Sequence, residues 1–190
     1  MRRKQIIAVL AILLGLAVCV QSGCAVNQSQ RNDTQSGQNV QIANPWRDVT
    51  EDEAKALCPH SFGVPAGAEN VVWRAMNASA DDFPGALVQL SFDLNGDSFT
   101  AREQVTGDKA ADISGMYYEW TQQDDITLAN WGDGQMKGQY YRYIGEEEWA
   151  DLCTWYDEEA GISYSVSVLS KDLDGFDLQA IAEALCTPRN

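Results

Sequence analysis

The sequence predicts an α+β fold, with an antiparallel sheet of about six to seven strands in hairpins and an N-terminal and a C-terminal helix packed on one face. Three observations predict it: apolar and polar residues alternate in several short runs, turn residues join these runs in pairs, and helix signals stand at both ends of the folded part. The clearest run is 162–169, in which apolar residues alternate with Ser163, Ser165 and Ser167. This pattern predicts a strand with one face on a core and its serine face in water.

The first predicted element of the folded part is a helix that begins after Thr50. Acidic residues occupy 51–53, and Thr50 and Glu53 have the spacing of a capping box. We expect the helix to end near Cys58, because Pro59 follows it.

The next elements are strands, predicted from alternation and from turn residues. The first runs are 70–77, 86–94 and 98–105, and Asn95-Gly96 predicts a tight turn between the last two. Segment 112–120 has adjacent rather than alternating aromatic residues, and we interpret it as a loop entering a strand.

Two further hairpins and a second helix complete the fold. Runs 125–131 and 139–144 flank a glycine-rich turn, and the short break 158–161 joins run 151–157 to run 162–169. Apolar residues then recur at helical spacing, which predicts the C-terminal helix; they are Leu178, Ile181, Ala182 and Leu185.

Residues 1–23 have the features of a lipoprotein signal peptide. A basic start at 2–4 precedes an apolar run over 6–20 that is short for a membrane span. Ser22-Gly23-Cys24 resembles the end of a bacterial lipobox, whose cysteine is lipidated and becomes the mature N-terminus, although Gln21 departs from that pattern. We therefore expect a lipid anchor at Cys24, with a plainly cleaved signal and an uncleaved anchor as the alternatives.

A polar segment follows the predicted anchor. Residues 24–43 are rich in Gln, Asn and Ser and almost lack large apolar groups, so they cannot bury enough surface to offset the entropy of ordering. We interpret them as a flexible tether to a single α+β domain over 44–190.

Three cysteines remain in the predicted domain. Cys58 and Cys186 fall near the ends of the two predicted helices, which favours a disulfide between them, whereas Cys153 lies within a strand and is expected to be a buried thiol. The alternative is that all three are reduced and buried, because a thiol packs as a small hydrophobic group.

The charge and the metal-ligand types limit the function classes. The net charge of -15 argues against binding nucleic acid, and against binding anionic lipid by charge. His60 is the single histidine, and segment 93–97 resembles the start of a calcium loop but lacks the later glycine and bidentate carboxylate. The sequence therefore predicts no metal and no cofactor.

Paired carboxylates are the one catalytic pattern that the sequence offers. Glu147 and Asp151 could serve a cell-envelope hydrolase that cleaves glycosidic bonds. Consecutive glutamates on a loop are usually solvated, however, so we predict no catalytic residue.

Ten aromatic residues gather between positions 117 and 156. In the adjacent pairs 140–141 and 155–156, one ring of each pair should point into the core and the other outward. Exposed rings could bind sugar or peptide, although packing under loops or across strands is the more common role of such rings. The candidate binding aromatics are Tyr117, Trp120, Tyr141, Trp149 and Trp155.

Three segments carry a resemblance to a known family. They are Asp-Ile-Ser-Gly-Met-Tyr-Tyr-Glu-Trp at 112–120, Leu-Cys-Thr-Trp-Tyr at 152–156 and Lys-Asp-Leu-Asp-Gly-Phe-Asp at 171–177. Over roughly 44–187, the chain resembles a domain of unknown function found in lipoproteins and membrane-anchored extracytoplasmic proteins of Gram-positive bacteria. The resemblance implies an extracytoplasmic location and brings no catalytic residues. The leading hypothesis is a lipid-anchored, non-enzymatic module that binds an envelope protein or a glycan.

Overall fold

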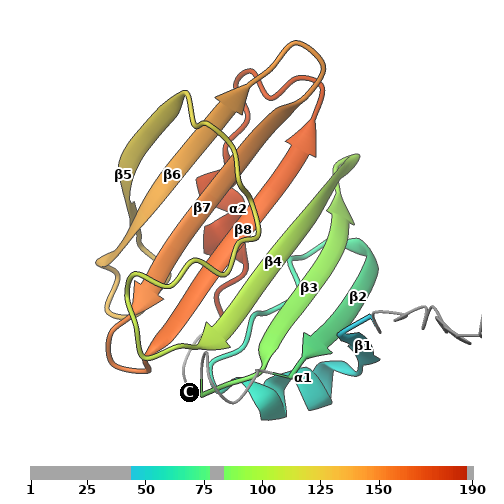
Figure 1. The fold of residues 1–190 in the computed structure, drawn as a ribbon, viewed down its shortest axis with the longest axis vertical. Helices are drawn as coiled ribbons and strands as arrows, with labels where there is room; N and C mark the ends of the chain where they lie inside the picture. The colour runs from blue at the N-terminus through green and yellow to red at the C-terminus, as the bar shows by residue number, and fades with distance from the viewer. Residues whose placement is uncertain (1–43, 78–83, 188–190) are drawn as a thin grey trace, which may run out of the picture. The chain divides into compact units, whose positions relative to one another are not determined.

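The computed structural model describes residues 44–77 and 84–187, all of which belong to the second of two compact units, 42–190. These residues form eight strands and two helices (Figure 1). In chain order they are β1 (Trp46–Val49), α1 (Glu51–Leu57), β2 (Glu69–Met76), β3 (Leu87–Leu94), β4 (Asp97–Val105), β5 (Gln122–Leu128), β6 (Met136–Ile144), β7 (Trp149–Asp157), β8 (Ile162–Ser170) and α2 (Leu178–Ala184).

The predicted fold class is confirmed, with one strand more than expected. All eight strands lie in one antiparallel sheet of order β1-β2-β3-β4-β8-β7-β6-β5. The unexpected strand is β1, a four-residue edge strand that pairs with β2 immediately before the cap of α1. Its sequence, Trp-Arg-Asp-Val, is too short to show an alternating pattern, so only pairing with β2 defines it.

The predicted helix signals are confirmed at both ends. The Thr50 side chain accepts from the Glu53 backbone N–H while the Glu53 carboxylate accepts from the Thr50 backbone N–H, which completes the capping box of α1. At α2, the Asp177 carboxylate accepts from the Ala180 backbone N–H. Both helices contribute buried residues to the same hydrophobic core, so both cover one face of the sheet.

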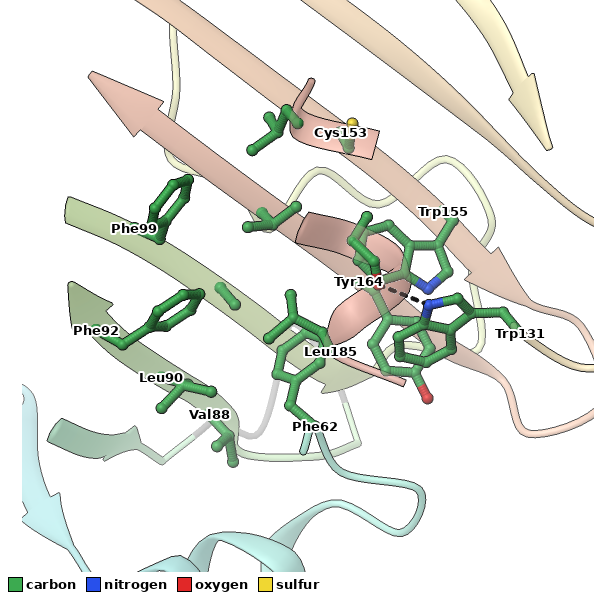
Figure 2. Close-up of a cluster of buried hydrophobic side chains, with 14 of the residues drawn as sticks. Phe62, Val88, Leu90, Phe92, Phe99, Trp131, Cys153, Trp155, Tyr164 and Leu185 are labelled. Carbon is green, nitrogen blue, oxygen red and sulfur yellow. Dashed lines mark hydrogen bonds between the residues drawn. The ribbon is translucent and has the colours of Figure 1, made fainter. Parts of the chain in front are cut away.

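The core under α2 is centred on four aromatic rings from separate parts of the chain (Figure 2). Phe62 comes from the segment between α1 and β2, Trp131 from the β5–β6 turn, Trp155 from β7 and Tyr164 from β8. Trp155 and Tyr164 are stacked with ring centroids 5.4 Å apart, and Phe62 meets the Tyr164 ring edge-on at 5.6 Å. Such contacts add roughly 0.5–1.5 kcal/mol per pair to the burial of the rings themselves.

Two predictions about these strands need correction. Trp131 was expected at the end of a strand, but β5 ends at Leu128 and Trp131 enters the core from a turn, where its indole N–H donates to the Ala182 carbonyl at 2.8 Å. The serine face of β8 was expected in water, but Ser163, Ser165 and Ser167 are all buried. The reason is that β8 is central in the sheet and a long loop crosses its second face.

A buried carboxyl group holds the segment that delivers Phe62. Glu103 of β4 is fully buried on the helix-covered face; its carboxyl group accepts from the Ser61 hydroxyl at 2.5 Å and from the Phe62 backbone N–H at 3.1 Å. Burial raises the pKa of the Glu103 carboxyl from its usual 4.5 to about 8, and the two hydrogen bonds lower it only in part.

Replacing Glu103 should therefore remove a pH dependence of stability. Between the unfolded pKa near 4.5 and the folded pKa near 8, the folded chain keeps a proton that the unfolded chain has lost. Stability from this group is thus complete below pH 4.5 and falls as the pH rises, by at most about 1.4 kcal/mol per pH unit. Urea unfolding of the wild type and of Glu103→Gln should give a stability difference that changes steadily from pH 5 to pH 8. A difference independent of pH would contradict this account.

The structure does not contain the predicted Cys58–Cys186 disulfide. Cys58 is a free, fully buried thiol beside α1, and the Cys186 thiol donates to the Asn130 carbonyl at 2.7 Å. Cys153 is a buried free thiol on β7, as predicted. Burial raises the pKa of both the Cys58 and the Cys153 thiols, which keeps them protonated and unreactive.

The predictions for the N-terminal part lie outside the described residues. These are the signal peptide over 1–23, the lipid anchor at Cys24 and the tether over 24–43. Within 44–77 and 84–187, no helix is long and apolar enough to cross a membrane.

Candidate functional site

The candidate site lies between the second face of the sheet and the loop that connects β4 to β5. This loop, residues 106–121, runs across the front of β8 and β7 in Figure 1, while α2 lies behind the same strands. It is held at both ends. The Thr106 and Ser163 hydroxyls are hydrogen-bonded at 2.8 Å, and the Tyr118 hydroxyl donates to Glu148 at 2.8 Å. We call this segment the crossing loop.

Arg102 of β4 fixes the middle of the crossing loop. Its guanidinium donates to the Ser114 carbonyl at 2.7 Å and to the Ile113 carbonyl at 3.3 Å, and it also donates to Gln89 on β3 at 2.9 Å. The loop reaches this position by a local turn in which the Asp112 carboxylate accepts from the backbone N–H and the hydroxyl of Ser114.

Gly115 is required where the loop passes over Arg102. Its φ of +66° is a conformation that side chains disfavour, and a Cβ atom there would lie 2.3 Å from Nη1 of Arg102. The Asp-Ile-Ser-Gly segment noted in the sequence is therefore the part of the loop that docks on the sheet.

A cavity of about 510 Å³ lies beneath the crossing loop. This volume is within the range that small-ligand sites occupy. Its roof is made by Lys109 to Ile113 and Met116 of the loop, and its floor by outward-facing residues of β6, β7 and β8. The floor includes Gln139, Tyr141, Leu152, Thr154, Tyr156 and Ser163.

Aromatic rings form one wall of the cavity and continue beyond it. Trp120 and Tyr141 both line the cavity, with ring centroids 5.5 Å apart. Tyr118 contacts Trp120 at 5.5 Å and Tyr143 at 4.9 Å, which extends the row along β6. Trp120, Tyr118 and Tyr141 are each only partly buried, so these rings keep accessible surface.

Two of the five predicted binding aromatics supply rings to this site. Trp120 and Tyr141 line the cavity, whereas Tyr117 is 86% exposed outside it. Trp149 lies on the opposite face, where the Arg142 guanidinium stands 5.9 Å from its ring.

Trp155 was a candidate binding aromatic, and the structure buries its ring. Trp155 borders the cavity from β7, but it is only 4% exposed and its ring is stacked in the core on Tyr164. In the pair 155–156 the outward ring is that of Tyr156. In the pair 140–141 the outward ring is Tyr141, because the Tyr140 hydroxyl donates to Asp151 on the other face at 2.9 Å.

Sequence reasoning missed the polar floor and the roof. Gln139, Thr154 and Tyr156 face the cavity because they alternate with inward-facing residues on β6 and β7, a signal that the register could have provided. Ile113 and Met116 had no such signal, since only the path of the crossing loop brings them over the sheet.

The structure does not assemble the carboxylate pair of the hydrolase alternative. Asp151 is fully buried on the face opposite the cavity, where Arg142 donates to both of its oxygens at 2.7 and 2.6 Å. Glu147 is exposed in the β6–β7 turn. Because Asp151 is held in an ion pair, it has no position from which to act on a substrate with Glu147.

Across 44–77 and 84–187, no three His, Cys, Asp or Glu side chains come together as metal ligands. In comparisons with known proteins, the chain matches no family model, no curated protein and no solved structure. The resemblance to extracytoplasmic lipoproteins therefore stays a prediction.

Replacing Gly115 should loosen the crossing loop. Gly115→Ala forces an unfavourable φ and displaces Arg102, which should lower the free energy of unfolding by about 2–3 kcal/mol. Gly175→Ala is the matched control, because Gly175 has a φ of +69° and nothing within 4 Å of the added Cβ. Urea unfolding and hydrogen exchange over 112–116 measure the difference. Equal losses in both variants would contradict the docking role of Gly115.

Proposed function

We propose that this protein is a non-enzymatic binding module, carried on the outer side of a membrane by a lipid at Cys24, and that the cavity under the crossing loop is its ligand site. The observation that carries the proposal is the cavity of about 510 Å³, whose wall presents the rings of Trp120 and Tyr141. Partly exposed rings beside neutral hydrogen-bonding groups are a common means of holding a ligand without reacting with it.

The chemistry of the cavity lining supports binding rather than catalysis. Its single carboxylate, Asp112, is engaged by Ser114 in the turn of the loop. The lining contains no histidine and no cysteine. The Ser163 hydroxyl bonds to the Thr106 hydroxyl and to the Asp108 carbonyl rather than to a lysine, so it has no neighbouring base to activate it as a nucleophile.

The predicted extracytoplasmic location and the candidate binding site are consistent with each other. An anchor at Cys24 followed by a polar tether over 24–43 would hold the domain away from the membrane surface. An envelope protein or a glycan is the ligand class that such a position would offer. The acidic composition favours solubility and disfavours non-specific adhesion to anionic lipid.

Trp120→Ala should weaken ligand binding about tenfold, because it removes one wall of the cavity. The measurement is a fluorescence titration of the full-length protein in phospholipid nanodiscs with a panel of cell-wall glycan fragments and envelope peptides. Tyr117→Ala is the control, since Tyr117 belongs to the same loop but lies outside the cavity. Equal binding by Trp120→Ala and the wild type would exclude the cavity as the site, and failure of all probes would count against a binding function.

Cys24→Ser should release the protein from the membrane, because a serine cannot carry the thioether-linked lipid. We expect the wild type to partition into the detergent phase of a cell extract and the Cys24→Ser variant to lose the lipid-dependent mass. The control is Cys19→Ser, which leaves the predicted lipobox cysteine in place. An unchanged mass and partition for Cys24→Ser would refute the anchor.

A further inference from the structure

The chemical type of the lining residues changes from one end of the cavity to the other. The strand register gives the order of these residues. On its floor, Gln139 stands opposite Thr154 and Tyr141 opposite Leu152, and Lys137 precedes Gln139 by two residues on β6. Successive outward residues on a strand are about 6.8 Å apart, so Lys137 and Tyr141 are separated by about 13–14 Å along β6. One end of the cavity is therefore cationic and the other is apolar and aromatic.

The cationic end has an ammonium group available to a ligand. The Lys137 ammonium donates to the Thr127 hydroxyl at 2.8 Å, and no carboxylate pairs with it among residues 44–77 and 84–187. Lys109 lines the same cavity but is paired with Glu158 at 2.8 Å. In a chain with a net charge of -15, a cavity-lining lysine without an acidic partner gives an anionic ligand a place to bind.

The aromatic end is shaped for a flat apolar group. Trp120 and Tyr141 provide rings, and Leu152 on the floor with Ile113 and Met116 in the roof surround them with aliphatic groups. A neutral sugar placed here would turn some of its hydroxyl groups toward Leu152, Ile113 and Met116, which offer them no strong hydrogen bond, and this is unfavourable. An aromatic ring would meet no such cost and would gain ring contacts.

We propose that the cavity binds a small organic acid that consists of a planar apolar ring with a carboxylate on a short chain. The ring lies against Trp120 and Tyr141, the chain passes Gln139 and Thr154, and the carboxylate meets the Lys137 ammonium. To meet the carboxylate, the Lys137 side chain would leave the Thr127 hydroxyl and turn along the cavity, and its long, flexible stem would then shorten the gap that one ring and a short chain must span. This inference rests on the proposed function, because it concerns the same cavity, and it replaces the glycan or envelope protein with a small organic acid as the ligand.

The test compares an acid with its own amide. Calorimetric titration of the full-length protein in nanodiscs would use 3-phenylpropionate and indole-3-propionate, each beside its neutral primary amide. We expect both acids to bind, the amides to bind about fivefold more weakly, and Lys137→Met to bind acid and amide equally, since an exposed ion pair contributes a factor of about this size. Trp120→Ala should weaken acid and amide alike, about tenfold.

The matched control is Lys171→Met, which removes the same charge from an exposed lysine outside the cavity. It should preserve the preference for the acid over the amide. If Lys171→Met abolished that preference as Lys137→Met does, long-range charge rather than a contact at Lys137 would explain it, and the inference would be overturned.

The remaining outcomes separate the ligand class from the function. Equal binding of acid and amide by the wild type, or no binding of either while a glycan fragment or peptide binds in a Trp120-dependent way, would overturn the inferred ligand and leave the binding function intact. Failure of every acid, glycan and peptide probe would overturn both.

Discussion

Phe62 stands at the centre of this fold because its ring fills the space that two short helices leave over a wide sheet. The sheet has eight strands, whereas α1 and α2 have seven residues each, so the helices alone cannot cover one face. The segment between α1 and β2 completes the cover by placing Phe62 against Trp131, Trp155 and Tyr164. Its backbone is satisfied by the buried Glu103 carboxyl and by the bond from the Gly63 N–H to the Leu185 carbonyl. Burial of the rings and satisfaction of the backbone therefore depend on the same few residues.

The second face of the sheet is also incompletely covered. The crossing loop covers it only in part. Arg102 attaches the loop to the sheet through hydrogen bonds to the carbonyls of Ile113 and Ser114, and the Tyr118 hydroxyl attaches its far end to Glu148. Between these attachments and the loop's start, the roof includes the small side chains of Ala110 and Ala111, which are too short to fill the space above β6 and β7. The cavity thus follows from how the loop is attached. A ligand would complete the cover that the loop leaves unfinished.

The part of the candidate site that could be predicted is the part that follows from the alternation of inward and outward residues along a strand. The pairs 140–141 and 155–156 each had to present one ring outward, and Tyr141 and Tyr156 do so. Alternation could not say which member of a pair faces the core, and Trp155, one of the candidate binding aromatics, is the buried member of its pair. It also could not show that both faces of β8 are covered, since a serine face beneath a loop has the same sequence as a serine face in water. The carboxylates of the hydrolase alternative separate for the same reason, because Asp151 falls on the inward face of β7.

The sequence by itself determined most of the secondary structure, most of the hairpin order and the cap of the first helix, because each depends on neighbours a few residues apart. Thr50 with Glu53, and the serines of β8, are examples. Only the tertiary structure decided that β1 is a strand, that the thiol of Cys58 is buried without a disulfide, and that Lys137, Tyr141 and Trp120 border one cavity. These features depend on which distant segments pack together. The position of the crossing loop depends on contacts such as those of Arg102 with Ile113 and Ser114. Such contacts produce no periodic pattern in the sequence.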